Sequence, residues 1–198
     1  MSIPRIIHRV IPAQTQLSEE IEGWWRGWQE LHPGWEFRTW PDQPDMAEFP
    51  RTSPHMGSCA GVQRADLIRL EALLIHGGIY LDDDVAPVRR LDPLLALRGF
   101  SAWESPTIVC TAALGAEPGH PAIQEALQLC IERVDQGAGP WETGPGVATQ
   151  VYPNRTDWIC LPPGTFYPYY IDQRERRDED FSLLPWCYGV HHWAGSWL

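Results

Sequence analysis

Three consecutive acids, Asp82, Asp83 and Asp84, follow a short apolar run in the middle of the chain. The run at residues 79–81 consists of strand-forming residue types, and side chains of an extended chain alternate between two faces. Asp82 and Asp84 are therefore expected on one face, together with Tyr80. Two neighbouring carboxylates repel each other unless a cation lies between them, and Mg²⁺ and Mn²⁺ prefer oxygen ligands. The spacing predicts a metal site that binds a diphosphate.

The residues around these acids help to distinguish a metal site from an acidic surface turn. Asp-rich turns are common, so an Asp-x-Asp pattern alone is a weak signal. Here the acids leave an apolar strand, and open α/β sheets bind ligands at the carboxyl ends of their strands. Near the end of the chain, His191 or His192 can add an imidazole ligand. Ser196 and Trp197 can supply an oxygen and a stacking ring. The alternative is that these histidines have no partner.

A second pair of charges lies upstream on a predicted helix. Apolar residues at helical spacing predict a helix over residues 61–76, and Gly77 and Gly78 end it. Asp66 and Arg69 are three residues apart and so occupy neighbouring rows of one helix face. Two interpretations follow from this spacing. The pair is either a surface ion pair, or an arginine that binds hydroxyls or phosphate of a ligand beside an aspartate that orients it.

Helices and strands follow one another along the chain in an order typical of an α/β sandwich. The first strand, at residues 3–10, is apolar on both faces and is expected to be central and parallel. We expect further strands at residues 35–40, 79–81, 100–103, 107–113 and 158–161, with a short continuation of the third strand segment at residues 85–88. We expect helices after Ser18, at residues 61–76, from His120 to about Val134 and from Thr143 to Gln150. The pattern predicts one α/β domain over residues 1–198, with a Rossmann-like mixed sheet flanked by helices.

Three tryptophans, Trp24, Trp25 and Trp28, lie on the helix that Ser18 is expected to cap. Tryptophans on a short helix most often form a core wall. Three indoles exceed what a core wall needs, and indole faces also suit sugar rings, so both interpretations stay open at this point.

Composition excludes several classes of function. The net charge of −11 argues against a protein that binds nucleic-acid phosphates, and a chain without lysine has no lysine base or Schiff-base former. No apolar run approaches the length of a membrane span, and the first residues do not resemble a secretory signal, so we expect a cytoplasmic protein. The cysteines are odd in number and form no CxxC pair, which indicates buried thiols: Cys59, Cys110, Cys130, Cys160 and Cys187.

Several segments resemble the DXD-containing sugar-binding region of family 32 glycosyltransferases. The central ones are PRIIH at residues 4–8, RADLIR at residues 64–69 and GGIYLDDDV at residues 77–85. The end, HWAGSW at residues 192–197, resembles the closing motif of such enzymes, and TGP at residues 143–145 and FYP at residues 166–168 are similar as well. The family includes α-mannosyltransferase-like and capsular-polysaccharide enzymes and is related to the glucosylating domains of large clostridial toxins.

The resemblance implies a GT-A-like fold, a nucleotide-sugar donor, Mn²⁺ or Mg²⁺ as cofactor, and retention of the anomeric configuration. Carried over residue by residue, it implies catalytic roles for Asp66, Arg69, Asp82 and Asp84; substrate binding by Ile7, His8, Asp66, Arg69, Gly78, Tyr80, Asp82, Ser196 and Trp197; and metal binding by Asp82, Asp84 and His192. Toxin-like members stack a tryptophan on uracil where this chain has Ile11. The resemblance therefore leaves the nucleotide base open.

We accordingly expect a metal-dependent, retaining glycosyltransferase that moves a sugar from a nucleotide-sugar donor to the hydroxyl of a glycan or other acceptor. One alternative is a metal-dependent phosphohydrolase acting on nucleotide diphosphates, which would use the same acids to activate water. The other is a catalytically inactive nucleotide-sugar-binding protein. Neither a nucleic-acid partner nor an integral membrane segment is expected. The sugar, the acceptor and the oligomeric state are not specified by the sequence.

Overall fold

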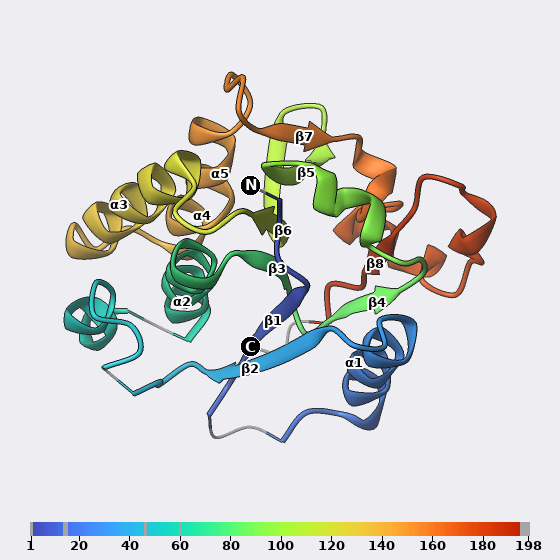
Figure 1. Cartoon of the computed structure of the whole chain (residues 1–198), viewed down its shortest axis with the longest axis horizontal. Coiled ribbons are helices and arrows are strands. Elements are labelled where there is room, and N and C mark those ends of the chain that lie inside the picture. Colours follow the sequence, from blue (N-terminus) through green and yellow to red (C-terminus); the bar gives the residue numbers. More distant parts are fainter. Residues whose placement is uncertain (1, 14–15, 46, 60, 195–198) are drawn as a thin grey trace.

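The strands form a six-stranded mixed sheet in the computed structural model of this protein, which describes residues 2–13, 16–45, 47–59 and 61–194 (Figure 1). Its strands are β1 (Ile6–Ile11), β2 (Glu36–Pro41), β3 (Gly78–Leu81), β5 (Gly99–Ser105), β6 (Ile108–Ala116) and β7 (Ile159–Leu161), in the order β2-β1-β3-β6-β5-β7. β1 pairs in parallel with β2 and β3. It is therefore an inner, parallel strand, as its two apolar faces predicted.

The second half of the sheet is mixed, with β6 antiparallel to both of its neighbours. β6 lies between β3 and β5 and runs antiparallel to both, while β7 pairs in parallel with β5. All four residues of β3 are buried, because β3 has a strand on each side and packed layers on both faces. The predicted mixed sheet flanked by helices is confirmed.

Five α-helices cover the sheet within the described ranges. They are α1 (Glu19–Leu31), α2 (Gly61–His76), α3 (Pro121–Asp135), α4 (Pro140–Thr143) and α5 (Pro145–Val151), with short 3₁₀ helices at Ser53–Ser58, Asp92–Ala96, Pro163–Thr165, Ile171–Arg176 and Phe181–Leu183. Ser18 caps α1 as predicted, because its side chain accepts a hydrogen bond from the Ile21 backbone N–H. Thr143 does not cap the helix that follows it, where Gly144 takes the cap position. The threonine side chain turns instead to Asp66.

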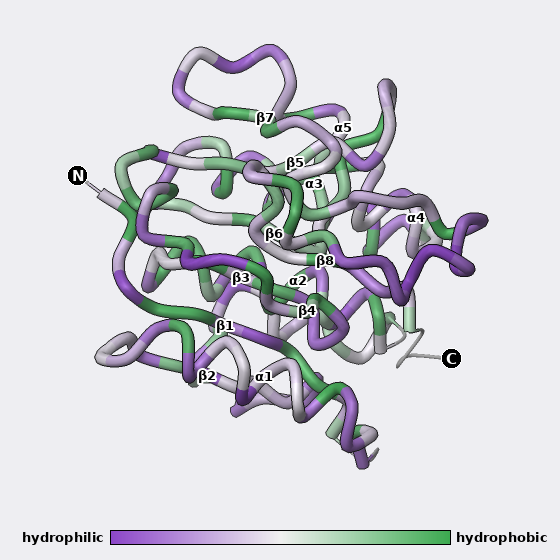
Figure 2. The backbone as a smooth tube through the Cα atoms, turned by 90° about the vertical axis from the view of Figure 1, so that its right-hand side faces the viewer, coloured by the Kyte–Doolittle hydropathy of each residue, from purple (hydrophilic) through white to green (hydrophobic). Residues whose placement is uncertain are grey.

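The sheet lies between two layers, with α2, α3 and α5 on one side and α1 on the other (Figure 1), and each layer has an apolar core. One face packs against α2, α3 and α5 in a core that includes Leu67, Tyr80 and Leu127. The other face packs against α1 and against residues between 166 and 193, in a core that includes Trp28 and Tyr167. Figure 2 shows hydrophobic stretches running through the central strands, whereas the peripheral connections are largely hydrophilic. The carboxyl end of β3 thus lies between two layers, each of which can supply side chains to it.

A separate two-stranded sheet joins the middle of the chain to its end. β4 (Val85–Pro87) pairs antiparallel with β8 (Gly189–His191), and Val85 is opposite His191. Residues 85–88 therefore do not continue the main sheet, because the turn after β3 directs them to a different partner strand. This pairing places the last residues of the described chain beside the acids that precede β4.

Two expectations from composition can be compared with the structure. All five cysteines are free thiols, and all but the half-buried Cys160 are buried, so the prediction of unpaired, buried thiols is confirmed. Among the helices of the described ranges, none combines the length and the apolar character needed to cross a bilayer.

Candidate active site

Asp82, Asp84 and His191 come together at the carboxyl end of β3. Each offers one ligand atom, and these atoms lie within 4.8 Å of one another. The two aspartates converge as predicted, but the strand ends at Leu81 and a tight turn follows, in which the Val85 N–H donates to the Asp82 carbonyl over 3.1 Å. The Asp82 N–H donates to the Ala112 carbonyl of β6 over 2.8 Å. Convergence thus results from a turn anchored to β6 rather than from an extended chain.

Two residues near the end of the described chain, His191 and Ala194, fix the position of the Asp84 carboxylate. His191 Nε2 lies 3.1 Å from Asp84 Oδ1, and the Ala194 backbone N–H donates to Asp84 Oδ2 over 2.8 Å. Burial alone would raise the pKa of Asp84, but the His191 charge and these hydrogen bonds outweigh it, so the pKa lies below its ordinary value. Burial alone would lower the pKa of His191, and the neighbouring Asp84 charge raises it above its ordinary value instead. The two groups stabilise each other's charged forms.

The histidine beside the acids is His191, which corrects the expectation of His192. The His192 ring stacks on Trp24 with centroids 4.6 Å apart, and its Nδ1 forms a hydrogen bond of 2.9 Å with the Tyr169 hydroxyl. Burial lowers the pKa of His192. Successive side chains of an extended chain point to opposite sides, so only one of two adjacent histidines can face Asp84.

Arg69 connects the acids to α2. Its Nη1 lies 3.2 Å from Asp82 Oδ1, and its Nη2 lies 3.4 Å from Asp66 Oδ1. The guanidinium also lies over the Tyr80 ring at 4.5 Å. Both Asp66 and Arg69 are 3% exposed, so the interpretation as a surface ion pair is wrong. The pair is a buried element of the site.

Backbone carbonyls fix the position of the arginine. Arg69 Nε donates to the Ala65 carbonyl over 3.2 Å, and Nη1 donates to the Thr111 carbonyl of β6 over 2.8 Å. Burial disfavours the guanidinium charge, but Asp82, Tyr80 and Asp66 raise the pKa of Arg69 above its ordinary value. Arg69 therefore remains a positive charge in a fixed orientation at the sheet edge.

Asp66 and Tyr80 complete the α2 side of the site. The Thr143 hydroxyl donates to Asp66 Oδ2 over 3.0 Å, and the Tyr80 hydroxyl donates to Asp82 Oδ1 over 2.6 Å. Burial raises the pKa of Asp66 to about 6, despite the neighbouring Arg69 charge. Gly144 packs so closely that an added Cβ would lie 3.1 Å from both Asp66 carboxylate oxygens. Sequence reasoning missed the contacts of Thr143 and Gly144, although the TGP segment was part of the resemblance.

Other predicted residues lie outside this group. Ile7 and His8 have no exposed surface, and the His8 ring bonds with the Gly77 carbonyl at 2.8 Å and accepts from Trp40 Nε1 at 3.1 Å. Gly78 is buried at the opposite end of β3, where a Cβ would lie 2.7 Å from the Ile6 carbonyl oxygen. The structure does not bring these three positions into the acid cluster. Ser196 and Trp197 lie outside the described residues.

The tryptophans of α1 divide between two roles. Trp25 and Trp28 are buried core residues, and Trp28 Nε1 donates to the Val85 carbonyl over 2.8 Å, which ties α1 to the residue after Asp84. Trp24 is half-buried, and its ring stacks on the His192 ring. The packing interpretation thus holds for two of the three.

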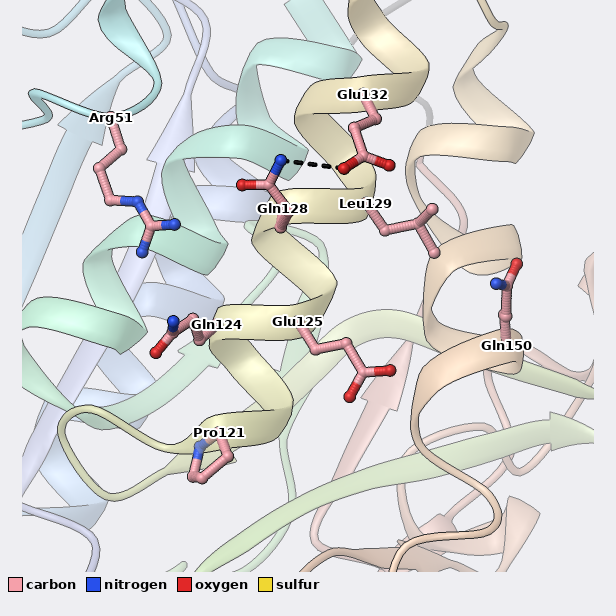
Figure 3. A pocket seen from close by; sticks show the side chains of 8 residues that line it. All are labelled: Arg51, Pro121, Gln124, Glu125, Gln128, Leu129, Glu132 and Gln150. Atoms are coloured by element: carbon pink, nitrogen blue, oxygen red, sulfur yellow. Dashed lines mark hydrogen bonds between the residues drawn. The ribbon is translucent and has the colours of Figure 1, made fainter.

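A hollow of about 550 Å³ lies elsewhere, on the outer surface of α3. Figure 3 shows the side chains that line it, none of which belongs to the acid cluster: Arg51, Pro121, Gln124, Glu125, Gln128, Leu129, Glu132 and Gln150. A smaller hollow of about 350 Å³ is lined by Arg174, Arg177, His192 and Ala194 among others, and by none of the three residues of the acid cluster. Ala194 is the residue that links this hollow to the cluster, because its N–H donates to Asp84.

A mixed sheet with paired aspartates and a buried arginine at the carboxyl end of one strand is the arrangement expected of a GT-A-like fold. Residues 18–100 match the family model described as the glycosyltransferase sugar-binding region containing the DXD motif, a span that includes Asp66, Arg69, Asp82 and Asp84. This part of the chain is therefore similar to the sugar-binding region of glycosyltransferases that contain the DXD motif. His191 and Thr143 lie beyond the matched residues.

Curated yeast proteins are similar to this chain in sequence. Inositol phosphoceramide mannosyltransferase 2 of Schizosaccharomyces pombe is 33% identical over 213 aligned positions, which cover 98% of this chain and 58% of that protein. Inositol phosphoceramide mannosyltransferase 3 of the same organism is 34% identical over 137 residues, 64% of this chain and 37% of that protein. A mannosyl phosphorylinositol ceramide synthase of Saccharomyces cerevisiae is 38% identical over 135 residues, 64% of this chain and 35% of the synthase. The chain thus spans about a third to three fifths of their lengths.

Two solved structures share the fold. The PaToxG glycosyltransferase superposes with a TM-score of 0.64 at 17% identity, covering 76% of this chain and 69% of that one. A glycosyltransferase involved in the glycosylation of the major capsid of PBCV-1 superposes with a TM-score of 0.55 at 16% identity, covering 94% of each chain. These likenesses support the GT-A-like architecture.

Proposed function

We propose that this chain transfers a hexose, with mannose as the first candidate, from a nucleotide-sugar donor to an acceptor hydroxyl, and that it uses a divalent cation. The observation that carries the proposal is the cluster of Asp82, Asp84 and His191, which lies next to the buried Arg69–Asp66 pair. The names of the yeast relatives support mannose and an inositol-containing acceptor.

The ligand set fits Mn²⁺ or Mg²⁺. Two carboxylates supply hard oxygen ligands, and an imidazole suits Mn²⁺ better than Mg²⁺. His191 Nδ1 is buried and has no hydrogen-bond partner among the described residues, so this ring has a nitrogen left to bind another group. A cation held by Asp82, Asp84 and His191 would offset the charge that develops on the departing diphosphate.

The buried Arg69–Asp66 pair would bind the donor sugar. Arg69 is held by two backbone carbonyls, so it loses little conformational entropy when it donates to a sugar hydroxyl. Asp66 accepts from Thr143 through Oδ2 and retains lone pairs that a hydroxyl can use. The close approach of Gly144 leaves no room for a larger residue beside this carboxylate.

We also propose that transfer retains the anomeric configuration, as the family resemblance implies. The acceptor hydroxyl would then attack on the face from which the diphosphate leaves. NMR of the first-formed product measures this directly, and an inverted anomer would contradict it.

The function is tested with purified chain, Mn²⁺ and a thermal-shift panel of nucleotide sugars, followed by transfer assays with the donor that stabilises the chain most. Asp84→Ala should lower transfer at least about 100-fold in saturating Mn²⁺, since it removes a charge that positions the cation. Asp178→Ala is the control, because Asp178 is 94% exposed. Unchanged transfer in Asp84→Ala would contradict the proposal. Phosphate or nucleotide released without glycosylated acceptor would indicate a phosphohydrolase, and donor binding without turnover would indicate a binding protein.

A further inference from the structure

Glu104 lies at an irregularity in the hairpin of β5 and β6. Trp103 pairs with Val109 and Ser105 pairs with Ile108, and the register shifts between these two pairs, so Glu104 has no partner residue of its own. Such bulges redirect a side chain and are frequent next to active sites. The bulge is also connected to the acid cluster through β6. The Ala112 carbonyl of this strand accepts from the Asp82 N–H, and the Thr111 carbonyl accepts from Arg69.

The side chain of Glu104 is on the face of the sheet that carries His191. Ala102, two residues earlier on β5, packs in the same core as Cys110 and Tyr167, whereas Trp103 packs in the opposite one. The Glu104 carboxylate bonds with the Cys110 thiol. The rings of Tyr167 and His191 form a T-shaped pair with centroids 5.6 Å apart. A continuous row of side chains therefore connects Glu104 with the metal cluster.

Glu104 differs from the other carboxylates around the site in forming no ion pair among the described residues, although the charge of His191 acts on it and opposes the rise in its pKa that burial causes. Asp66 and Asp82 pair with Arg69, and Asp84 pairs with His191, whereas no ion pair involves Glu104 within the described ranges. The residue is half-buried, and burial raises its pKa. A half-buried carboxylate without an ion pair is costly unless hydrogen-bond donors offset the burial, and the Cys110 thiol offsets only part of it, because the pKa of Glu104 still lies above its ordinary value. Its unused lone pairs can accept a hydrogen bond from a bound hydroxyl.

We propose that Glu104 binds the acceptor, by accepting a hydrogen bond from an acceptor hydroxyl on the His191 side of the metal cluster. The inference rests on the proposed function, because an acceptor exists only if sugar is transferred. It assigns the acceptor to the bulged end of β5, while the donor sugar is assigned to Arg69 and Asp66 on α2. The two substrates would then approach the metal cluster from opposite faces of the sheet.

The competing explanation is that Glu104 supports His191, through its negative charge and through Cys110 and Tyr167. The two roles differ in what they change. A residue that binds the acceptor affects transfer to the acceptor alone. A residue that supports His191 also affects Mn²⁺ binding and transfer of the sugar to water, since both depend on the metal cluster.

The test compares Glu104→Gln with wild type in three measurements: Mn²⁺ affinity by calorimetry, hydrolysis of the donor without acceptor, and transfer to methyl α-mannoside and to myo-inositol 1-phosphate. We expect kcat/KM for the acceptor to fall about 10- to 100-fold, while Mn²⁺ affinity and hydrolysis stay within about twofold. Glu104→Asp retains a carboxylate and should transfer faster than Glu104→Gln. Glu30→Gln, on the exposed side of α1, is the matched control and should resemble wild type in all three.

Each remaining outcome overturns the inference. Equal losses of hydrolysis and transfer, or weaker Mn²⁺ binding, would assign Glu104 to the support of His191. Transfer by Glu104→Gln at the wild-type rate would show that it touches no acceptor. If the wild-type protein itself transfers sugar to no acceptor, both the proposed function and this inference fail. If the wild-type protein transfers sugar and Glu104→Gln does so equally well, only the inference about Glu104 fails.

Discussion

Arg69 is the side chain that links the two halves of the site. It contacts Asp66 on its own helix, Asp82 after β3, the ring of Tyr80 and the backbone of Thr111. A buried charge of this kind is tolerable only when its partners are fixed in advance. The residues around Asp82, Asp84 and His191 are therefore positioned before any ligand binds.

The adjacent histidines provide a matched pair of substitutions. His191→Ala should weaken Mn²⁺ binding at least about 10-fold, because it removes one of three clustered ligands. His192→Ala should change it less than about threefold, since that ring is engaged by Tyr169 and Trp24. Calorimetric titration with Mn²⁺ measures both. A larger effect of His192→Ala would restore the expectation drawn from the sequence.

Asp66 should give the folded chain a characteristic dependence on pH. Its pKa is raised to about 6 on folding, so the folded state binds this proton more tightly than the unfolded state. The stability that this group contributes is present below a pH of about 4 and is lost as pH rises through about 6. The Asp66→Asn variant has no carboxyl group to ionise at this position, so it does not lose this stability as the pH rises. Relative to wild type, it should gain about 2 kcal/mol in the free energy of unfolding between pH 4.5 and pH 7.5, while sugar transfer falls.

Urea unfolding of both proteins at the two pH values measures this gain. An Asp66→Asn change that is the same at both values would show that Asp66 is ionised throughout. The expected result is a residue retained for binding at a cost in stability, which is common at functional sites.

At the scale of elements, the junction of α4 and α5 brings backbone close to the Asp66 carboxylate. Gly144 separates the two short helices and takes the cap position of α5. Its hydrogens face the Asp66 carboxylate, which in turn contacts Thr143. A loop in this position can restrict the space next to Asp66 without contributing a charge.

Gly144→Ala should raise the KM for the donor about 10-fold, because the new methyl group would lie 3.1 Å from both Asp66 oxygens and displace the carboxylate. Gly57→Ala is the control, since an added Cβ there meets nothing within 4 Å. Steady-state kinetics with varied donor gives the measurement. Equal KM values for the two variants would show that the junction moves freely.

At the scale of the whole molecule, the site joins segments from distant parts of the chain. The acids lie in the middle, and His191 comes from β8, which is held next to them by its pairing with β4. Trp28 of α1 bonds to the carbonyl of Val85 in the same pair. Metal binding should therefore stabilise the chain as one unit, in keeping with the prediction of a single domain.

Scanning calorimetry tests this cooperativity. We expect one transition whose calorimetric and van't Hoff enthalpies agree. Mn²⁺ at about 100 times its dissociation constant should raise the transition temperature by roughly 5–10 °C without splitting it. EDTA should reverse the increase. Two transitions, of which Mn²⁺ moves only one, would instead divide the chain into independent domains.

Much of this arrangement could be predicted from local sequence. The apolar run before the acids, the glycine stop after α2 and the serine before α1 each act over a few residues, so β3, α2 and α1 were located correctly. The acid pair was recognised for the same reason. Thr143 was misassigned as a cap because its real partner, Asp66, lies 77 residues away in sequence. Nothing in the sequence singled out Glu104, whose placement depends on a bulge.

The sequence by itself determined the ligand chemistry, namely two carboxylates after a buried strand and an arginine on the preceding helix, because these depend on residue type and short spacing. Only the tertiary structure decided which histidine faces the acids, and that Asp66 and Arg69 are buried. Both depend on the pairing of β4 with β8 and on the packing of α2 against the sheet. Such contacts join residues far apart in the chain, and no local pattern encodes their geometry.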